Sequence, residues 1–159
     1  MGVSGSGKTT IGVALAKKLT CLFIEGDDLH PPSNVAKMRE GTPLTDQDRA
    51  PWLTSLAAKM KETKDSGQSC VVACSALKAA YRRTLNVDND VHFVMLEISY
   101  ETALDRLKNR KGHFMPASLL KSQFQTLQEP QDAITVNAEQ ALEEVVVEIV
   151  EKLASADGQ

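Results

Sequence analysis

The chain has 159 residues, of which 42% are hydrophobic and 25% are charged, values typical of one globular domain with a single buried core. The formal net charge of -3 gives no reason to expect nucleic acid or a membrane surface as a partner, and no apolar run approaches the roughly 20 residues that cross a bilayer. The three cysteines form no CxxC pair and are interpreted as buried thiols in a reducing compartment, so we expect a cytoplasmic protein.

The chain opens on a glycine-rich motif that is followed by a helical pattern. Residues 2–9 read Gly-Val-Ser-Gly-Ser-Gly-Lys-Thr and satisfy GxxxxGK[ST] at every constrained position. In such a loop, backbone N–H groups converge on phosphate oxygens, the lysine reaches the β- and γ-phosphates, and the threonine hydroxyl ligates Mg²⁺. The motif therefore predicts a site for ATP and Mg²⁺. The residues predicted to bind the nucleotide are Gly2, Ser4, Gly5, Ser6, Gly7, Lys8, Thr9 and Thr10, with Lys8 also catalytic and Thr9 also a metal ligand.

A phosphate loop of this kind normally follows a buried strand, and only Met1 stands before Gly2. In a parallel sheet that strand lies between two others, so its loss would leave two ladders unpaired across roughly 10 Å. We therefore expect that the first strand is missing from this chain and that some 5–10 upstream residues belong to the natural protein. Low stability is expected without them.

The rest of the chain alternates apolar runs of strand length with longer helical patterns, which is typical of an α/β fold around a parallel sheet. In the first half we expect a helix over 9–19, a strand over 21–24, a short polar helix or turn over 31–40, a helix over 48–64 and a strand over 70–74. In the second half we expect a strand over 91–98, a helix after Ser99, a helix over 117–127, a strand over 133–136 and a closing helix with apolar positions from 142 to 153.

Three local signals refine these boundaries. Ser99 is predicted to cap the helix that follows it, and Asn137 with Gln140 has the pattern of a capping box. Gly112 and Pro116 interrupt the helical pattern between them, which indicates a loop.

Short motifs spread over the chain share one resemblance. They are Gly-Asp-Asp-Leu-His-Pro at 26–31, Gly-Thr-Pro-Leu at 41–44, Asp-Arg-Ala-Pro-Trp-Leu at 48–53, Cys-Ser-Ala-Leu-Lys at 74–78, Arg-Lys-Gly-His-Phe at 110–114 and Ser-Gln-Phe at 122–124. Together with the phosphate loop, they resemble gluconokinase from Met1 to about Pro130. The resemblance implies transfer of the ATP γ-phosphate to the 6-hydroxyl of D-gluconate, giving 6-phospho-D-gluconate.

The resemblance also implies a fold and its division. The fold is a P-loop kinase three-layer sandwich with a parallel sheet, in the shikimate-kinase-like branch of the nucleoside-monophosphate-kinase fold. It makes residues 1–159 a single domain, with a substrate-binding region at about 27–65 and a lid at about 111–118. Relatives with this pattern are often dimers, so a homodimer is an open expectation.

Two carboxylates follow the strand predicted over 21–24, which is the second strand of the fold when the missing first strand is counted. Asp27 lies just beyond it, at the sheet edge where ligands gather, and is the candidate base or orienter for the acceptor hydroxyl. A helix N-cap or turn residue is the alternative reading of Asp27. Glu25 stands where related kinases carry an aspartate that touches the water shell of Mg²⁺, so it is a candidate metal ligand.

Gluconate carries a carboxylate and a row of hydroxyls, which calls for a guanidinium and short polar groups. Arg49 is the candidate for the carboxylate, with a surface ion pair to Asp46 or Asp48 as the alternative. The further candidates for the substrate are His30, Lys78, Tyr81, Arg82 and His113.

Arg106 and Arg110 stand four residues apart on one predicted helical face. The resemblance places them beside the lid, where Arg110 would stabilise charge on the transferring phosphoryl group and Arg106 would pack on the adenine face. A solvated basic face that pairs with Glu101 or Asp105 is the alternative.

Other functions find less support in the sequence. The three histidines lack metal-ligand spacing, and aromatic residues make up only 4% of the chain, which argues against zinc and against nucleic acid. A kinase for another small acid such as shikimate, a non-catalytic nucleotide-binding protein and an inactive truncated form stay open as alternatives.

Overall fold

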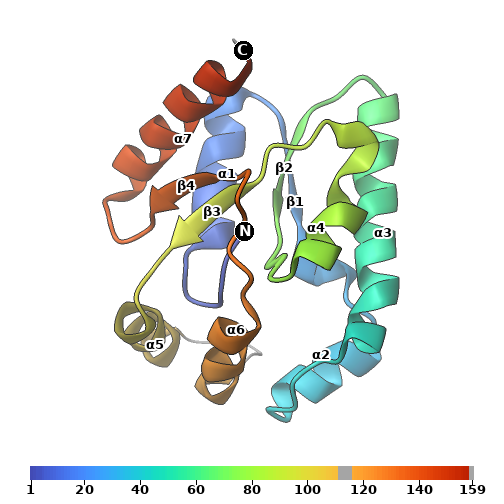
Figure 1. The fold of residues 1–159 in the computed structure, drawn as a ribbon, viewed down its shortest axis with the longest axis vertical. Helices are drawn as coiled ribbons and strands as arrows, with labels where there is room; N and C mark the ends of the chain where they lie inside the picture. Colours follow the sequence, from blue (N-terminus) through green and yellow to red (C-terminus); the bar gives the residue numbers. More distant parts are fainter. Residues whose placement is uncertain (111–115, 158–159) are drawn as a thin grey trace.

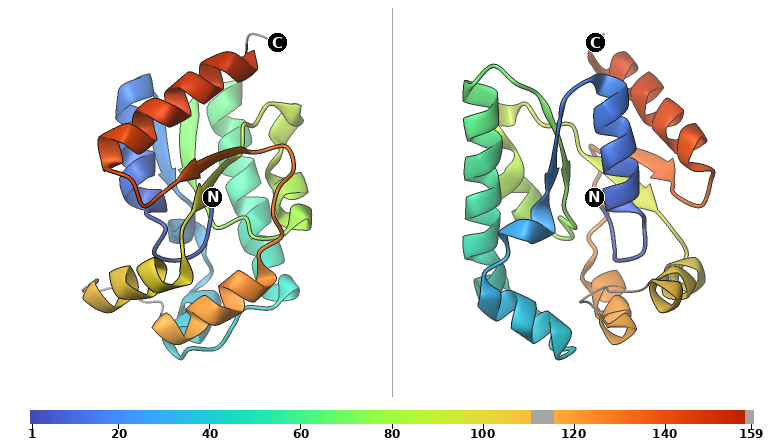
Figure 2. Two further views of the ribbon diagram at one scale, coloured as in Figure 1. Left: turned by 60° about the vertical axis from the view of Figure 1, so that its left-hand side comes forward. Right: turned by 180° about the vertical axis from the view of Figure 1, so that it is seen from behind.

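The structure is a computed structural model that describes residues 1–110 and 116–157. Its strands lie in a central layer between two layers of helices, with α1 and α7 on one face and α3 and α4 on the other (Figures 1 and 2). The elements are α1 Lys8–Leu19, β1 Leu22–Glu25, α2 Pro32–Arg39, α3 Asp46–Asp65, β2 Cys70–Ala73, α4 Ala79–Leu85, β3 Val94–Glu97, α5 Tyr100–Asn109, α6 Leu120–Thr126, β4 Ile134–Asn137 and α7 Leu142–Asp157, with 3₁₀ turns at Gly26–Leu29, Val87–Asn89 and Ala117–Leu119. The predicted α/β layering is confirmed.

The described strands form two parallel pairs. β1 pairs with β2 in the register Leu22 to Cys70, and β3 pairs with β4 in the register Val94 to Ile134. The chain at Met1 and Gly2 lies between the pairs (Figure 1), where the N–H of Leu96 donates to the Met1 carbonyl at 3.0 Å. The space between β2 and β3 is therefore the position expected for a strand that leads into the phosphate loop.

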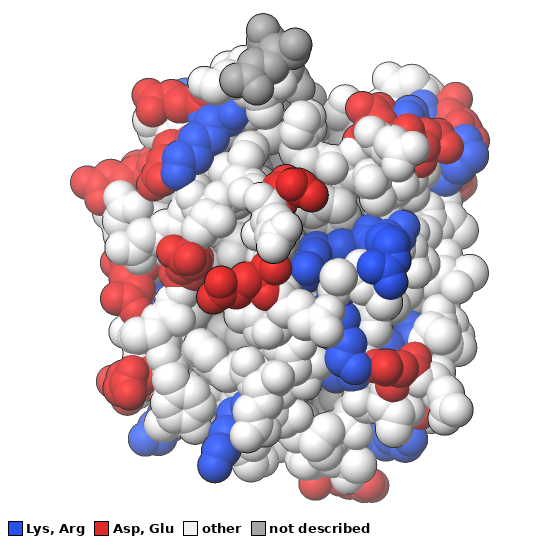
Figure 3. All heavy atoms as spheres, in the orientation of Figure 1, with Lys and Arg blue, Asp and Glu red and all other residues white. Residues whose placement is uncertain are grey.

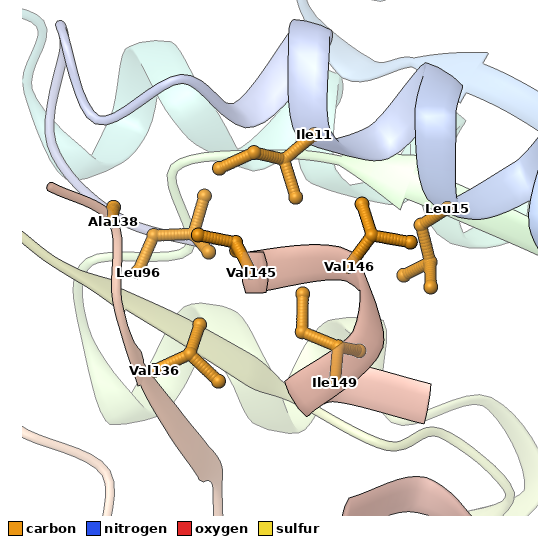
Figure 4. Packing of buried hydrophobic residues seen from close by; sticks show 8 residues of the cluster. All are labelled: Ile11, Leu15, Leu96, Val136, Ala138, Val145, Val146 and Ile149. Carbon is orange, nitrogen blue, oxygen red and sulfur yellow. The ribbon is translucent and has the colours of Figure 1, made fainter. Parts of the chain in front are cut away.

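Two apolar clusters hold the helices on the strand layer. On one face, side chains from α1, β3, β4 and α7 meet, as Figure 4 shows; its buried members are Ile11, Leu15, Leu96, Val136, Ala138, Val145, Val146 and Ile149. On the other face Trp52, Leu56, Tyr81 and Leu85 join α3 to α4. The apolar positions predicted for the closing helix thus pack in the core, because their period of about 3.6 residues keeps these side chains on one face of α7.

The helix over 48–64 is two residues longer at its N-terminus than the apolar pattern suggests. The Thr45 hydroxyl accepts from the N–H of Asp48 at 3.1 Å, and the Asp48 carboxylate accepts from the N–H of Thr45 at 2.9 Å. This reciprocal capping box starts α3 at Asp46. Ser99 caps α5 as predicted, since its side chain accepts from the N–H of Thr102.

Two expectations about the elements are wrong, and one helix was not expected. Asn137 and Gln140 do not cap the closing helix, because Asn137 ends β4 and α7 begins only at Leu142. α4 carries no recognisable apolar period over its seven residues, and the sequence did not predict it. The strand expected over 91–98 is paired only from Val94 to Glu97, where β4 lies beside it.

The surface carries charges of both signs. On the face in Figure 3, Lys, Arg, Asp and Glu form small separate groups rather than one continuous basic stripe. Among the described residues, no helix is long and apolar enough to span a bilayer.

Candidate active site

Two glycines shape the phosphate loop. Gly5 has φ of 81°, and a Cβ there would lie 2.7 Å from the carbonyl oxygen of Ala103 in α5, so only glycine lets the loop pack this closely. Gly7 has φ of 90° and stands at the N-cap of α1, where no side chain caps the helix. The first-turn N–H groups of α1 are thus directed at the loop, and they favour an anion there.

Lys8 begins α1 and reaches back across the loop. Its Nζ donates to the Val3 carbonyl at 2.9 Å. Burial lowers the pKa of Lys8, and the carboxylates of Asp27 and Glu25 oppose this effect. The ammonium is therefore held near two carboxylates in a poorly hydrated place, where a phosphate would find few competing water molecules.

Thr9 and Glu25 form a pair of oxygen donors beside the loop. The Thr9 hydroxyl donates to Glu25 Oε2 at 2.5 Å. The backbone N–H of Asp27 donates to Glu25 Oε1 at 3.5 Å. Mg²⁺ prefers oxygen ligands and commonly takes one or two from the protein, with phosphates and water completing its shell. The described residues contain no set of three or more His, Cys, Asp or Glu that could hold a metal alone, so this two-residue donor set fits Mg²⁺ brought with a nucleotide.

Contacts with β2 and α3 hold the turn that carries Asp27 in place. A Cβ on Gly26 would lie 2.5 Å from the carbonyl oxygen of Ala73, so the turn can rest on the end of β2 only with glycine. Trp52 Nε1 donates to the Gly26 carbonyl at 2.7 Å from the buried face of α3. Asp27 follows β1 directly, which leaves its carboxylate at the carboxyl edge of the strands.

His30 lies between Trp52 and Asp27. Its ring stacks on Trp52 with the centroids 4.0 Å apart, and its Nε2 is 3.9 Å from Asp27 Oδ1. The Asn34 amide nitrogen lies 3.2 Å from Nδ1 and can only donate, so the neutral ring carries its proton on Nε2, facing Asp27. Burial lowers the pKa of His30 to about 4, an effect that Asp27 opposes and Arg49 adds to.

One cavity brings the phosphate loop and the predicted substrate region together. Ser4 and Lys8 line it from the loop, and Asp27, His30 and Arg49 line it from the opposite side. The arrangement sets a cationic, amide-rich loop against a carboxylate, a neutral imidazole and a guanidinium. Such a site can hold a polyanion and a polar acceptor next to each other.

Three polar residues line the same cavity without having been predicted as site residues. They are Ser75, Ser122 and Gln123. Gln123 Oε1 accepts from the backbone N–H of Ser4 at 2.6 Å, so α6 contacts the phosphate loop directly. All three belong to short motifs of the resemblance, but a serine or glutamine has no pattern of its own that marks it as a ligand.

The remaining substrate candidates fall into two groups. Arg49 donates to the Leu44 carbonyl at 2.7 Å and to the Tyr81 hydroxyl at 3.2 Å. Lys78 and Tyr81 in turn both donate to Asp46, and these two hydrogen bonds lower the pKa of that carboxyl. Lys78 and Tyr81 are thus linked to the site through Asp46 and Arg49, and the described lining of the cavity does not include them.

Arg82 has a different position from the one expected. It is buried, and its guanidinium donates to the carbonyls of Ala76 and Leu77 at 3.0 and 3.3 Å. These bonds hold the loop between β2 and α4, and the described lining of the cavity does not include Arg82. The guanidinium donates to the Ala76 carbonyl and adds a second donor to the Leu77 carbonyl, which also accepts from the N–H of Gln128 at 2.8 Å.

The two arginines of α5 lie near the phosphate loop in different ways. Arg106 donates to the carbonyls of Gly5 at 3.4 Å and Ala138 at 2.9 Å, so it joins the loop to the end of β4. Arg110 caps the C-terminus of α5, and its charge lowers the pKa of Lys8. His113 and most of the predicted lid at 111–118 lie outside the described residues.

Comparison with known proteins gives one consistent answer. The family model described as shikimate kinase matches residues 4–154. The gluconokinase of Gluconobacter oxydans is 47% identical over 161 residues, which cover 99% of this chain and 90% of that protein. A solved sugar kinase from Janibacter sp. HTCC2649 is 44% identical with a TM-score of 0.91, covering 97% of this chain and 91% of its own. A solved gluconokinase from Sinorhizobium meliloti 1021 is also 44% identical, with a TM-score of 0.87 and coverages of 98% and 90%.

Proposed function

The chain belongs to the shikimate kinase family and groups there with gluconokinases, and from this premise we propose that it transfers the γ-phosphate of ATP to the 6-hydroxyl of D-gluconate. The product is 6-phospho-D-gluconate. The observation that carries the proposal is the shared cavity, in which Lys8 of the phosphate loop and Asp27, His30 and Arg49 of the acceptor side lie together. The proposed reaction consumes ATP, which fits the predicted cytoplasmic location.

Phosphoryl transfer needs an oriented alcohol and a stabilised phosphate more than it needs covalent chemistry. In the proposed mechanism Asp27 accepts a hydrogen bond from the 6-hydroxyl and takes its proton as the O–P bond forms and the bond from Pγ to ADP breaks. The Nε2–H of His30 faces the Asp27 carboxylate at 3.9 Å and would help to orient it. Lys8 and the amides of the loop stabilise the negative charge on the transferring group.

Thr9 and Glu25 would hold Mg²⁺, Thr9 through its hydroxyl and Glu25 directly or through bound water. When bound, Mg²⁺ neutralises charge on the β- and γ-phosphates. Arg49 is proposed to bind the gluconate carboxylate, because its guanidinium lines the cavity and Tyr81 and Leu44 orient it. Lys78 and Tyr81 contribute through Asp46 rather than by direct contact.

The arginines of α5 have separate proposed roles. Arg110 would stabilise charge on the transferring phosphoryl group, since it is close enough to Lys8 to affect its pKa. Arg106 would keep its bonds to Gly5 and Ala138 while its apolar stem borders the adenine. The expected homodimer stays a prediction that sedimentation analysis would test.

The direct test is ADP release from Mg·ATP with gluconate, shikimate and a panel of other sugar acids as acceptors. Gluconate is expected to give a kcat/KM at least about 100-fold above that of any other acid, because Arg49 and the polar lining act on carboxylate and hydroxyls together. Comparable rates with shikimate would move the assignment to another small-acid kinase. ADP release that no acceptor increases would contradict the proposal.

A further inference from the structure

Asn34 is a buried polar residue that lies behind the acceptor side of the cavity. It stands in the first turn of α2 with 2% of its surface exposed, and the described lining of the cavity does not include it. Its neighbour His30 does line the cavity, through a side chain that is 4% exposed. A buried amide costs stability unless its hydrogen-bonding groups find partners, so the partners of Asn34 indicate its role.

The amide nitrogen of Asn34 has two acceptors. It lies 2.8 Å from the Asp48 carbonyl oxygen and 3.2 Å from Nδ1 of His30. A carbonyl oxygen can only accept, so the contact with Asp48 identifies this end of the side chain as the NH₂ group. An NH₂ group has two hydrogens, one for each of these acceptors. Nδ1 of His30 therefore accepts a hydrogen bond, and the neutral ring carries its proton on Nε2.

The surroundings of His30 keep its ring neutral and in one orientation. Burial lowers its pKa to about 4, an effect that the Asp27 carboxylate opposes and the Arg49 guanidinium adds to. The ring stacks on Trp52, so it cannot turn freely. Nε2 lies 3.9 Å from Asp27 Oδ1, which is longer than a hydrogen bond. The Nε2–H and the carboxylate can therefore both contact one hydroxyl group placed between them.

The second hydrogen bond of Asn34 reaches the backbone beside Arg49. Asp48 directly precedes Arg49 in the first turn of α3, which begins beside α2 (Figure 1). The Asp48 carboxylate also pairs with Lys37 of α2, at 2.7 Å. The start of α3 is thus attached to α2 through both the backbone and the side chain of Asp48. One amide group of Asn34 holds the imidazole near Asp27 and the backbone next to Arg49 at the same time.

We propose that Asn34 is a positioning residue for the acceptor. It fixes His30 as a hydrogen-bond donor that faces Asp27, and it sets the place of this donor relative to Arg49. This inference rests on the proposed function, in which Asp27 contacts the 6-hydroxyl of gluconate and Arg49 contacts its carboxylate. An acceptor held at both ends has to match the distance between these groups. Asn34 therefore acts on the acceptor rather than on ATP.

The state of the His30 ring is measured by ¹⁵N NMR of the imidazole nitrogens at pH 7, without substrate. The His30 signals are those that His30→Gln lacks. In the parent we expect a proton on Nε2 and none on Nδ1. Asn34→Asp has nearly the same shape but presents only acceptor oxygens to Nδ1, so Nδ1 should be protonated, whether the ring is neutral or charged.

A protonated Nδ1 in the parent would overturn the proposal, and so would an unprotonated Nδ1 in folded Asn34→Asp. Neither measurement depends on kinase activity, so its failure is distinct from a failure of the proposed function.

Steady-state ADP release tests what this positioning does. Asn34→Asp is expected to lower kcat/KM for gluconate at least about tenfold, because a misplaced donor no longer orients the acceptor. The KM for ATP should stay within about twofold of the parent value, since the phosphate loop keeps its contacts. Ser33→Asp is the matched control: it adds the same charge at an exposed residue of the same turn and should keep the parent kinetics. Equal losses in both variants would contradict the proposal.

A double-mutant cycle tests whether Asn34 acts through His30. His30→Gln removes the imidazole, so Asn34→Asp should cost at least about threefold less in that background than in the parent. The same loss in both backgrounds would overturn the proposal. If circular dichroism shows that Asn34→Asp has lost helix content, Asn34→Ala replaces it in the kinetic measurements, with Ser33→Ala as its control and the same expected results. The NMR measurement on the parent is unaffected by this change.

Discussion

At the scale of single residues, Asp27 offers the sharpest test of the mechanism. Asp27→Asn keeps the size of the side chain but removes its ability to accept a proton, so kcat should fall by at least about 100-fold. Nucleotide affinity should not change, because Lys8 and the loop amides bind the phosphates. Steady-state ADP release and titration with a fluorescent ATP analogue measure the two quantities. Asp28→Asn, the exposed neighbour, is the matched control, and an equal loss of kcat in both variants would remove Asp27 from the mechanism.

His30 predicts a pH dependence of stability. Its folded-state pKa of about 4 is below the unfolded value of 6.5, so the unfolded chain binds the proton more readily between these pH values. The contribution of His30 is therefore neutral above about pH 6.5, and the free energy of unfolding falls as the pH drops towards 4, by at most about 3 kcal/mol. Urea unfolding of parent and His30→Phe from pH 4 to 8 measures this difference.

The slope of stability against pH is compared between the two proteins. His30→Phe should flatten the slope of the parent. An unchanged slope in His30→Phe would mean that other groups titrate in this range.

The sequence predicted the residues of the phosphate loop because phosphate binding requires these residue types at fixed spacing. The glycines let backbone N–H groups approach the phosphate oxygens, and the lysine reaches the β- and γ-phosphates. It also predicted the position of Asp27 directly beyond a strand, which follows from the alternation of elements. It could not predict that Arg82 faces backbone carbonyls while Arg49 faces the cavity, because both are arginines in motifs of the same resemblance. The direction of a long side chain depends on tertiary packing, which no local pattern contains.

At the scale of elements, the guanidinium of Arg82 holds the loop between β2 and α4. Arg82→Met keeps most of the apolar stem but leaves the Ala76 and Leu77 carbonyls without this donor, so the free energy of unfolding should fall by about 1–3 kcal/mol. The KM for gluconate should stay close to that of the parent, since Arg82 is outside the described lining of the cavity. Urea unfolding and initial rates check both statements.

Arg83→Met is the control, because Arg83 is exposed on the same helix and its loss should cost little stability. A large rise of KM in Arg82→Met without a change of stability would return Arg82 to the substrate site.

Elements with a long apolar period were predictable, and short ones were not. The periods of α1, α3 and α7 extend over three or more turns, which averages out single exceptions. α4 has only seven residues, and tertiary contacts of Tyr81 and Leu85 stabilise it. The bounds of β3 were overestimated because residues 91–93 line a cavity, and the paired register with β4 begins only at Val94.

At the scale of the whole molecule, binding at the phosphate loop should stabilise the fold. A non-hydrolysable Mg·ATP analogue at about 100 times its Kd is expected to raise the free energy of unfolding by about 2.7 kcal/mol. The effect reaches the whole molecule because α1 extends from the loop into the apolar core through Ile11 and Leu15. Denaturant unfolding with and without the analogue measures it. Lys8→Ala should lose most of the gain, and an equal gain in that variant would show that the analogue binds elsewhere.

The position of Cys74 has a practical consequence. The thiol lies at the end of β2, within the lining of a cavity between β2 and β3, and burial raises its pKa to about 11. At neutral pH almost none of it is thiolate, so alkylation at this cysteine is expected to be slow in the folded protein. Unfolding removes the burial that raises this pKa, so the rate of alkylation at Cys74 should rise when the protein unfolds and reports on unfolding without any engineered label.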